Sequence, residues 1–485
     1  MPADRPPNVL FILADDLGWA DLGCYGSTFY ETPHLDRLAA DGLRFTDGYA
    51  ACPVCSPTRA SLMTGKYPAT VGITNYIPGN AWGKLMGVPY FHELPEGETT
   101  VAGALRDAGY ATWHVGKWHL GGRDRWPTRC GFDVNVAGCH WGMPQRGYFS
   151  PYGIETLEDG PDGEYLTDRL TDEAIRLVEG GRGGGKPWFL HLAHYAVHTP
   201  IQAPADLVEK YRRKAADLGL TPEQDLVEGE LMPALHKKNQ HVVRRTRQSN
   251  PAYAAMVENL DSNVGRLLDA LERTGQVENT LVLFTSDNGG LSTAEGSPTC
   301  NAPLCEGKGW MYEGGVREPW IARWPAVIEG GRESEATITS PDLFPTLLDI
   351  AGLDAMPRQA VDGKSFAAKL RGDAFERGPV FWHYPHYSNQ GGGPACSVRD
   401  GRFKLIEFFE DGKLELYDLA SDIGESRDLA ADDAATRDRL HALLVAWRES
   451  VAAKIPQPNP HYDAMLAGTM PSPNGNGVIP GDDHN

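Results

Sequence analysis

Four apolar runs of five or six residues occur in the first 290 positions, and polar residues follow closely after each run. The runs cover residues 9–14, 110–115, 188–193 and 281–285. Continuous apolar runs of this length, without alternation, predict strands that are buried on both faces, as in a parallel sheet. Segments with helical spacing cover residues 34–42, 99–108, 165–179, 252–274 and 341–351. The alternation of strands and helices predicts an α/β fold built around a large, mostly parallel sheet.

The pattern changes near residues 372–378. Beyond them, short alternating stretches at 380–384, 397–399, 403–406 and 414–417 are separated by turn signals at Asp400-Gly401 and Asp411-Gly412, which predicts an antiparallel sheet. An amphipathic helix is expected over 434–451. We therefore predict a main domain over 1–375 and a smaller α+β subdomain with an extended tail over 376–485. The stretch 205–250 is polar, and its basic patch at 244–247 is expected to be a solvated loop or lid edge.

The net charge of −20 argues against general binding to nucleic acid or to an anionic membrane. The chain has no apolar run of 18 residues and so no expected membrane span, and its start shows no signal peptide. The sequence as it stands therefore predicts a cytoplasmic protein, or a periplasmic or secreted one if a leader has been removed. Eight cysteines are too sparse for a disulfide scaffold, but the pairs 130/139 and 300/305 are close enough in sequence to be bridged.

Polar side chains follow the ends of all four predicted buried strands. They are Asp15 and Asp16, Lys117 and His119, His194 and His198, and Asp287 and Asn288. The carboxyl edge of an open α/β sheet is where ligands bind, so these side chains are expected to meet there. Adjacent carboxylates repel each other unless a cation lies between them, and carboxylate and amide oxygens suit Ca²⁺ or Mg²⁺.

The stretch CPVCSPTRASLMTG, residues 52–65, predicts a short helix with Pro57 in its first turn and Gly65 as its stop. Cys55 would then stand at the helix N-terminus, with Arg59 about one turn further on, which is a place to hold an anion. Cys52 and Cys55 also form a CxxC pair, so a zinc half-site, a redox pair or an inert buried cysteine stay open from this pattern alone.

Taken together, the chain resembles the formylglycine-dependent (type I) sulfatases of the alkaline phosphatase-like superfamily. The stretches that carry the resemblance are NVLFILADDLGWADLGCYG, TPHLDRLAADGLRFTDGYA, CSPTRASLMTG, GYATWHVGKWHLG, TLVLFTSDNGG and GKGWMYEGGVREP, with LYDLASDIGESRDLA near the C-terminus. The resemblance implies an α/β/α sandwich and makes the main domain catalytic. It also implies hydrolysis of a sulfate monoester, of a saccharide or an aryl alcohol, to alcohol and inorganic sulfate.

The resemblance assigns a role to each strand-end residue. It implies that a formylglycine-generating enzyme converts Cys55 to formylglycine, whose hydrate is the nucleophile. It implies that Ca²⁺, with Mg²⁺ as an alternative, is bound by Asp15, Asp16, Asp287, Asn288 and the modified Cys55. The remaining active-site positions fall on Arg59, Lys117, His119, His198 and Lys308. Asp287 would accept the proton of the attacking hydroxyl, and His119 would deprotonate the second hydroxyl to release sulfate. The chain departs from the usual pattern at Thr58 and His34, neither of which is expected to prevent conversion.

The nearest alternative is a phosphonate or phosphate mono- or diesterase of the same superfamily, since the same nucleophile and cation suit phosphoryl transfer. A non-catalytic binding protein is a weaker alternative, because the positions expected to be catalytic are all occupied. For the substrate pocket, aromatic and histidine side chains are candidates to stack on and bond to a sugar ring. They are His140, Trp141, His194, His383 and His386.

Overall fold

A computed structural model describes residues 6–181, 185–353 and 359–473 of the protein. Its centre is an eight-stranded sheet with the strand order β11-β2-β10-β9-β1-β6-β4-β5. The strands of this sheet are β1 (Asn8–Ala14), β2 (Leu43–Phe45), β4 (Ala111–Gly116), β5 (Val134–Val136), β6 (Trp188–Ala193), β9 (Thr280–Ser286), β10 (Trp320–Arg323) and β11 (Arg332–Ser334). A small ladder of β3 (Gly48–Tyr49) and β12 (Ile338–Thr339) lies outside it.

The four apolar runs form the contiguous middle of this sheet. Strands β9, β1, β6, β4 and β5 are all parallel, and only β10 runs against its neighbours β9 and β2. The ends of the strands are also in register, since Ala14 pairs with Ser286 and Gly116 pairs with Ala193. The predicted mostly parallel sheet is confirmed.

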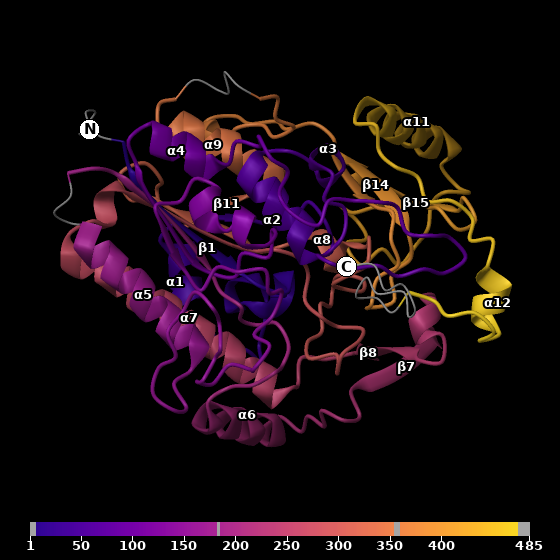
Figure 1. The fold of residues 1–485 in the computed structure, drawn as a ribbon, viewed down its shortest axis with the longest axis horizontal. Coiled ribbons are helices and arrows are strands. Elements are labelled where there is room, and N and C mark those ends of the chain that lie inside the picture. The colour runs from indigo at the N-terminus through magenta and orange to yellow at the C-terminus, as the bar shows by residue number, and fades with distance from the viewer. Residues whose placement is uncertain (1–5, 182–184, 354–358, 474–485) are drawn as a thin grey trace.

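Helices cover both faces of the sheet (Figure 1). On one face lie α1 (Pro33–Ala40), α5 (Leu166–Gly181) and α7 (Pro251–Thr274), and on the other α2 (Cys55–Thr64), α4 (Val101–Asp107) and α9 (Leu343–Ile350). Strand β1 shows why both faces need a cover: Leu10 and Ile12 pack into one apolar cluster, and Val9, Phe11 and Leu13 into the other. The predicted α/β/α sandwich is confirmed.

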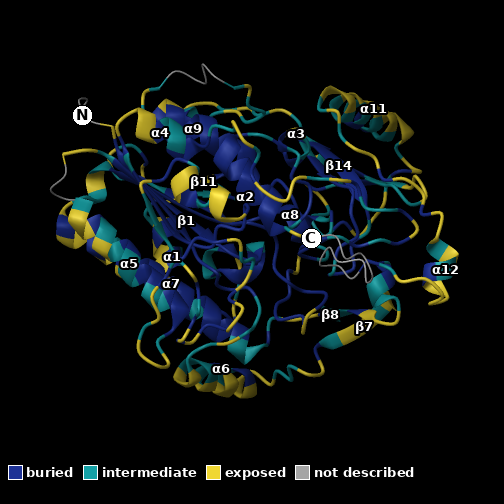
Figure 2. Cartoon of the chain, viewed as in Figure 1, coloured by how far each residue is buried: buried dark blue, intermediate teal, exposed yellow. Residues whose placement is uncertain are grey.

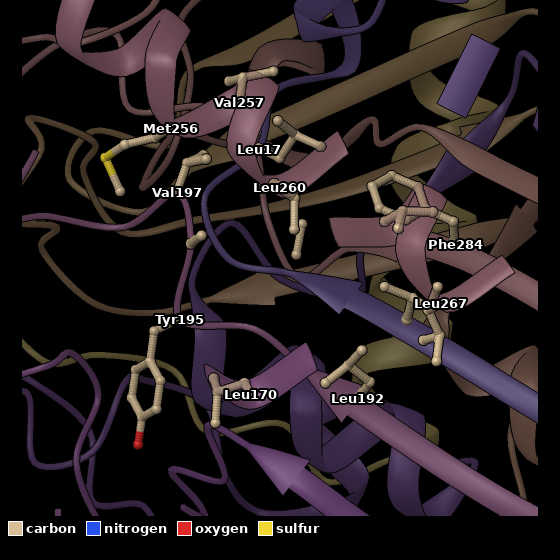
Figure 3. Packing of buried hydrophobic residues seen from close by; sticks show 14 of the residues in the cluster. Leu17, Leu170, Leu192, Tyr195, Val197, Met256, Val257, Leu260, Leu267 and Phe284 are labelled. Carbon is tan, nitrogen blue, oxygen red and sulfur yellow. The ribbon is translucent and has the colours of Figure 1, made fainter. Parts of the chain in front are cut away.

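The larger of the two clusters lies between the sheet and helices α5 and α7. Figure 3 shows its centre, where Leu260 and Leu267 of α7 and Leu170 of α5 meet Leu192 of β6 and Phe284 of β9. These five side chains are fully buried or nearly so. Burial of a side chain of this size contributes about 1.5–3 kcal/mol, so this packing fixes β6 and β9 against their helices. The strand ends that carry polar residues are therefore held on a rigid support.

The C-terminal part forms an antiparallel meander of β13 (Val380–Tyr384), β14 (Ala395–Asp400), β15 (Phe403–Phe408) and β16 (Leu414–Asp418). Helix α11 (Ala434–Ser450) packs on one face through Leu440 and Leu444. The turn predicted at Asp400-Gly401 is present, with Gly401 at a left-handed φ of 61°. This confirms the predicted sheet and helix, while the domain boundary at 375/376 stays a prediction.

The described part of the tail, with α12 (Tyr462–Leu466), binds the main body through backbone hydrogen bonds from Met86 to Gln457 and from Asn459 to Lys84. The end of the predicted tail, residues 474–485, lies outside the described residues. Further short α-helices are α3 (Pro68–Val71), α8 (Glu313–Val316) and α10 (Ala367–Leu370).

The interpretation of the basic patch 244–247 as a solvated loop was wrong for Arg244 and Arg245, which belong to a strand. The stretch 205–250 holds helix α6 (Ala205–Asp217), which packs on α7, and an antiparallel hairpin of β7 (Leu226–Leu231) and β8 (His241–Arg245). Within the basic patch, Arg245 is buried because its guanidinium donates to the carbonyls of Ser297 and Pro222 and to Ser249 Oγ.

All eight cysteines are free, so neither Cys130/Cys139 nor Cys300/Cys305 is bridged. Within the described ranges, no helix is both long enough and apolar enough to cross a membrane.

Candidate active site

Helix α2 presents Cys55 at its N-terminus, as the sequence predicts. Cys55 is the first residue of the helix, and Gly65 closes it in a left-handed conformation with φ of 71°. All ten residues of the helix are buried, which Figure 2 shows as an unbroken dark ribbon. Cys52 packs in an apolar cluster, and its backbone is held on both sides by the Thr58 hydroxyl. This favours a packing role for Cys52 over a CxxC redox pair or zinc half-site.

The polar residues at the ends of β9, β1, β6 and β4 meet in front of Cys55. Asp15 forms an ion pair with Lys117, with Nζ 2.7 Å from a carboxylate oxygen, and Asp16 forms one with Lys308, also at 2.7 Å. His198 Nε2 lies 3.6 Å from the same Asp16 oxygen. The structure therefore brings the predicted residues of three strands and of the Lys308 loop to one point.

Asp287 completes the acidic centre from β9. Its carboxylate accepts from Arg59 Nε at 2.8 Å and from the backbone N–H of Asp16 at 3.3 Å. The Asn288 amide donates to Asp16 Oδ1 at 2.8 Å. Arg59 also donates to the Lys117 carbonyl at 2.9 Å, so the helix that carries Cys55 is tied directly to the strand ends.

Several polar atoms in this centre lack partners, although they are buried. Asp15 Oδ1 and Asn288 Oδ1 accept no hydrogen bond from the described residues. Orphaned buried oxygens of this kind are costly unless something binds them. Burial and the Asp287 carboxylate raise the pKa of Asp15, which is the strain expected of carboxylates packed together without a cation.

His198 gives a second indication of a cation. Its Nδ1 lies 2.8 Å from the Thr199 carbonyl, which can only accept, so Nδ1 carries the hydrogen. Burial lowers the pKa of His198 to about 3, so in the neutral ring the lone pair of Nε2 faces the Asp16 oxygen. Among the described His, Cys, Asp and Glu residues, only Asp15, Asp16 and His198 come close enough together to hold a metal ion. The donor set fits a hard cation with oxygen ligands.

His119 faces the cysteine directly. Its Nδ1 lies 3.3 Å from Cys55 Sγ, and its Nε2 lies 2.6 Å from the carbonyl of Ile77. Because that carbonyl can only accept, Nε2 carries the hydrogen and Nδ1 offers a lone pair to residue 55. Burial and the charge of Lys117 hold the pKa of His119 well below its usual value, so the ring is a neutral base. Both Asp16 and His119 adopt left-handed backbone angles, with φ near 60°, strain of the kind that clusters at functional sites.

The site opens into a cavity of about 750 Å³. Cys55, His119, His198 and Lys308 lie at its floor, and its walls come from several loops. The wall residues include Tyr76, Ile77, Pro78, Met143, Gln145, Pro200, Ile201, Asn250, Glu295, Pro298, Asn389 and Gln390.

The cavity lining does not include the five candidate substrate residues. His194 is fully buried, and its ring nitrogens have no hydrogen-bond partner among the described residues. His383 Nε2 lies against the carbonyl of Lys454 and His386 Nε2 against the hydroxyl of Thr74, so one ring nitrogen of each is engaged away from the cavity. His140 and Trp141 do not line the cavity wall, whereas the next two residues in the chain, Gly142 and Met143, do. The structure thus places these residues elsewhere.

Comparison with known proteins decides which family this geometry represents. A family model described as Sulfatase matches residues 7–353. The chain belongs to the sulfatase family. A second model, described as N-sulphoglucosamine sulphohydrolase, C-terminal, matches residues 306–449 of this sulfatase.

Individual relatives agree. The sulfatase is 34% identical to arylsulfatase A of Homo sapiens, with 90% of this chain and 86% of the relative covered. It is 33% identical to N-acetylgalactosamine-6-sulfatase of Canis lupus familiaris, with coverage of 79% and 69%. Among solved structures it is similar to Ps i-CgsB, determined in complex with k-i-k-neocarrahexaose, with a TM-score of 0.72, 27% identity and coverage of 91% and 93%.

These findings establish an enzyme with the alkaline phosphatase-like fold that hydrolyses sulfate esters. They favour this reaction over phosphonate or phosphate ester hydrolysis and over a non-catalytic role. Membership of the family also implies a metal ion in general, which the donor set described above fits.

Sequence reasoning missed the substrate side of the cavity. Glu295 and Gln390, which line it together, stand on loops 95 positions apart with no motif around either. The only local signal was the run Gly289-Gly290 after Asn288, which marks the start of a loop but not its destination.

Proposed function

We propose that the protein hydrolyses a sulfate monoester with a formylglycine residue, formed from Cys55, as the nucleophile. The observation that carries the proposal is the position of residue 55. It stands at a helix N-terminus, 3.3 Å from a neutral imidazole nitrogen and within the field of Lys117 and Lys308. As a thiol it is a poor nucleophile, because burial raises the pKa of Cys55 above its ordinary value. The site thus suits an oxygen nucleophile better than a thiolate, and an aldehyde hydrate would supply two hydroxyl groups on one carbon.

The cation is proposed to be Ca²⁺, with Mg²⁺ as the alternative, bound by Asp15, Asp16, Asp287 and Asn288. Two oxygens without partners, Asp15 Oδ1 and Asn288 Oδ1, support this set. When bound, such an ion neutralises charge on sulfate oxygens and on the attacking oxygen.

The side chains around residue 55 bind the sulfate group and assist the leaving alcohol. Lys117 and Lys308 bind sulfate oxygens, an electrostatic contribution of several kcal/mol to the transition state. Asp16 holds the pKa of Lys308 above its usual value in spite of burial, so this lysine stays protonated. Lys308 stabilises the negative charge that develops on the leaving oxygen, and His198 assists departure of the alcohol in its protonated form, because the neutral ring carries no hydrogen on Nε2 to donate.

Proton transfer at residue 55 is proposed for Asp287 and His119. Asp287, oriented by Arg59, accepts the proton of the attacking hydroxyl group. His119 then accepts the proton of the second hydroxyl group through Nδ1, and this expels sulfate without an attack of water on sulfur. The Ile77 carbonyl keeps the imidazole in the tautomer that this step requires.

Maturation is proposed to depend on a formylglycine-generating enzyme that acts on the Cys55–Arg59 stretch before folding completes. In the folded chain Cys55 is only 3% exposed and Arg59 2%. Neither side chain could be reached by another enzyme once helix α2 is packed.

For the substrate, we propose a sulfated saccharide, with aryl sulfates as surrogate substrates. The cavity wall offers amide, hydroxyl and carboxylate groups beside apolar side chains, the mixture that a sugar ring with its hydroxyl groups and its apolar face requires. Two similar proteins, by their names, act on or bind saccharides.

The test has two parts. Mass spectrometry of the tryptic peptide that carries residue 55 should show an aldehyde, and turnover of 4-nitrophenyl sulfate should exceed turnover of bis(4-nitrophenyl) phosphate. The Cys55→Ala variant should lose activity by at least about 10⁴-fold, since residue 55 makes the covalent bond. Undiminished hydrolysis by that variant would refute the nucleophile, and a preference for the phosphate diester would favour the alternative esterase.

A further inference from the structure

The cavity is electrostatically divided. Its basic side chains, Lys308, His119 and His198, all lie at the floor, where sulfate would bind. Among the described residues that line the rest of the cavity, Glu295 is the only acidic or basic side chain. No arginine and no further lysine lines the described wall to receive a second anionic group of the substrate.

Glu295 is positioned by Gln390. The Gln390 amide nitrogen donates to Glu295 Oε1 at 2.9 Å. Its amide oxygen accepts from Ser388 Oγ at 2.8 Å, and Ser388 Oγ in turn accepts from the Gln390 backbone N–H, also at 2.8 Å. Because Gln390 is buried, with its amide orientation fixed at both ends, it holds one oxygen of Glu295 in place.

The loop that carries Glu295 is anchored on both sides. Before it, Thr293 accepts from the backbone of Val243 in β8 at 3.1 Å, and the Thr293 hydroxyl donates to the Gln390 carbonyl at 2.8 Å. After it, the Ser297 carbonyl accepts from Arg245 Nε at 2.6 Å. Glu295 itself has a left-handed φ of 56°, an unfavourable angle for a residue with a side chain.

No described residue donates a hydrogen bond to the second oxygen, Oε2. The residue is exposed overall, and it lies on the cavity wall. An oriented carboxylate with an oxygen open to a cavity is an acceptor for ligand hydroxyl groups and repels ligand anions.

We propose that Glu295 is a specificity-determining residue that restricts the enzyme to sulfate esters whose alcohol carries no second anionic group. The inference rests on the proposed sulfatase function and adds the charge of the substrate to it. The preferred alcohol is a neutral, hydroxylated ring that donates a hydrogen bond to Glu295 Oε2. Sugars with a further sulfate or a carboxylate near that position are disfavoured.

The size of the effect follows from Coulomb's law. A second unit negative charge a few ångströms from a carboxylate in a partly solvated cavity lowers kcat/KM by about tenfold or more. The loss of Glu295's charge should remove this penalty, and a positive charge in its place should reverse it.

The experiment compares two esters of equal size that differ in charge, 4-(hydroxymethyl)phenyl sulfate and 4-carboxyphenyl sulfate. We measure kcat/KM for both with wild type, Glu295→Gln and Glu295→Lys. The ratio of the carboxylate ester to the hydroxymethyl ester should rise about tenfold in Glu295→Gln and further in Glu295→Lys. Leaving-group differences cancel, because only the change in the ratio between variants is used.

Glu449→Gln is the matched control, since Glu449 is exposed on α11 and lies outside the described lining of the cavity. It changes net charge equally and should leave both rates and their ratio unchanged. A ratio within twofold of wild type in both Glu295 variants would overturn the proposal, while normal turnover of both esters would leave the sulfatase function standing. If wild type containing the aldehyde hydrolyses neither ester nor 4-nitrophenyl sulfate, the proposed function fails first and the specificity proposal with it.

Discussion

A buried ion cluster joins the C-terminal sheet to the main body, and its lysine gives the sharpest stability prediction. Lys404 of β15 is fully buried, with its Nζ 2.9 Å from Glu313 Oε1 and 3.0 Å from Glu425 Oε1. Glu313 belongs to α8, beside the loop that carries Lys308. The Lys404→Met variant keeps the length of the side chain and removes its charge.

The cost of this change should fall mainly on Glu425. Glu313 keeps Arg317 at 3.2 Å and the Tyr49 hydroxyl at 2.7 Å, whereas among the described residues only the Glu313 backbone N–H, at 2.6 Å, continues to bind Glu425. Removal of one partner from a buried ion pair costs about 3–5 kcal/mol, because an unpaired charge stays behind. We expect Lys404→Met to lower the free energy of unfolding by that amount at pH 8.5.

The penalty should depend on pH in a defined direction. Burial raises the pKa of Glu425 to about 7 in the folded protein, above its ordinary value near 4.5 in the unfolded chain. A raised folded pKa means that this group's contribution to stability is full below pH 4.5 and is lost as the pH rises through 7. Without Lys404 the pKa of Glu425 rises further, so the loss continues above pH 7 and the difference from wild type grows between pH 6 and pH 8.5.

Urea denaturation followed by circular dichroism at pH 6, 7 and 8.5 measures this. Lys413→Met is the control, because Lys413 is 56% exposed and its ion pair with Glu415 is worth at most about 1 kcal/mol. Adding Glu425→Gln to Lys404→Met should recover most of the loss and remove its pH dependence. A destabilisation below about 1 kcal/mol, or one that does not change with pH, would refute the reasoning.

Three further predictions concern the active site and its support. Removal of metal with a chelator should abolish hydrolysis of 4-nitrophenyl sulfate, and Ca²⁺ at 100 times its Kd should restore it and stabilise the fold by about 2.7 kcal/mol in thermal unfolding; no effect of either treatment would contradict the cation site. Thr58→Val should cost about 2 kcal/mol in urea denaturation, because both backbone groups of Cys52 lose a buried partner, whereas Thr58→Ser should cost little; equal losses would argue against the hydroxyl's role. Arg59→Lys should lower kcat/KM by about 100-fold in protein whose aldehyde content is verified by mass spectrometry, since lysine cannot reproduce the Nε contact with Asp287, and wild-type rates would count against that contact.

The clustering of polar residues around Cys55 could be predicted from the sequence, because it follows from a simple rule of the fold. Parallel strands place the residues that follow them at one edge of the sheet. Recognising four apolar runs as such strands was therefore enough to predict that Asp15, Lys117, His198 and Asp287 lie close together. Helix α2 could also be predicted, because Pro57 in its first turn and Gly65 at its end mark its limits in the local sequence.

Other elements depend on partners that are distant in the sequence. The hairpin β7–β8 and helix α6 lie in a stretch whose composition is polar, and Arg245 is charged yet buried. What holds Arg245 in place is a set of acceptors at Pro222, Ser249 and Ser297, and only the folded chain brings these together. Local propensity could not show this burial, because tertiary hydrogen bonds provide it.

The residues that line the wall of the cavity could not be predicted from the sequence for the same reason, and the five candidate substrate residues lie outside its lining. His383 and His386 could bind a sugar by their residue type, but Nε2 of each ring contacts another part of the chain, at Lys454 and Thr74. Residue type therefore says little about a loop-built wall, where each side chain is free to turn inward or outward. The electrostatic effect of a charged side chain extends beyond its direct contacts, so it depends less on whether the side chain turns inward or outward. Because Glu295 is the one acidic side chain among the described residues of the cavity wall, we expect its charge to disfavour anionic alcohols relative to neutral ones.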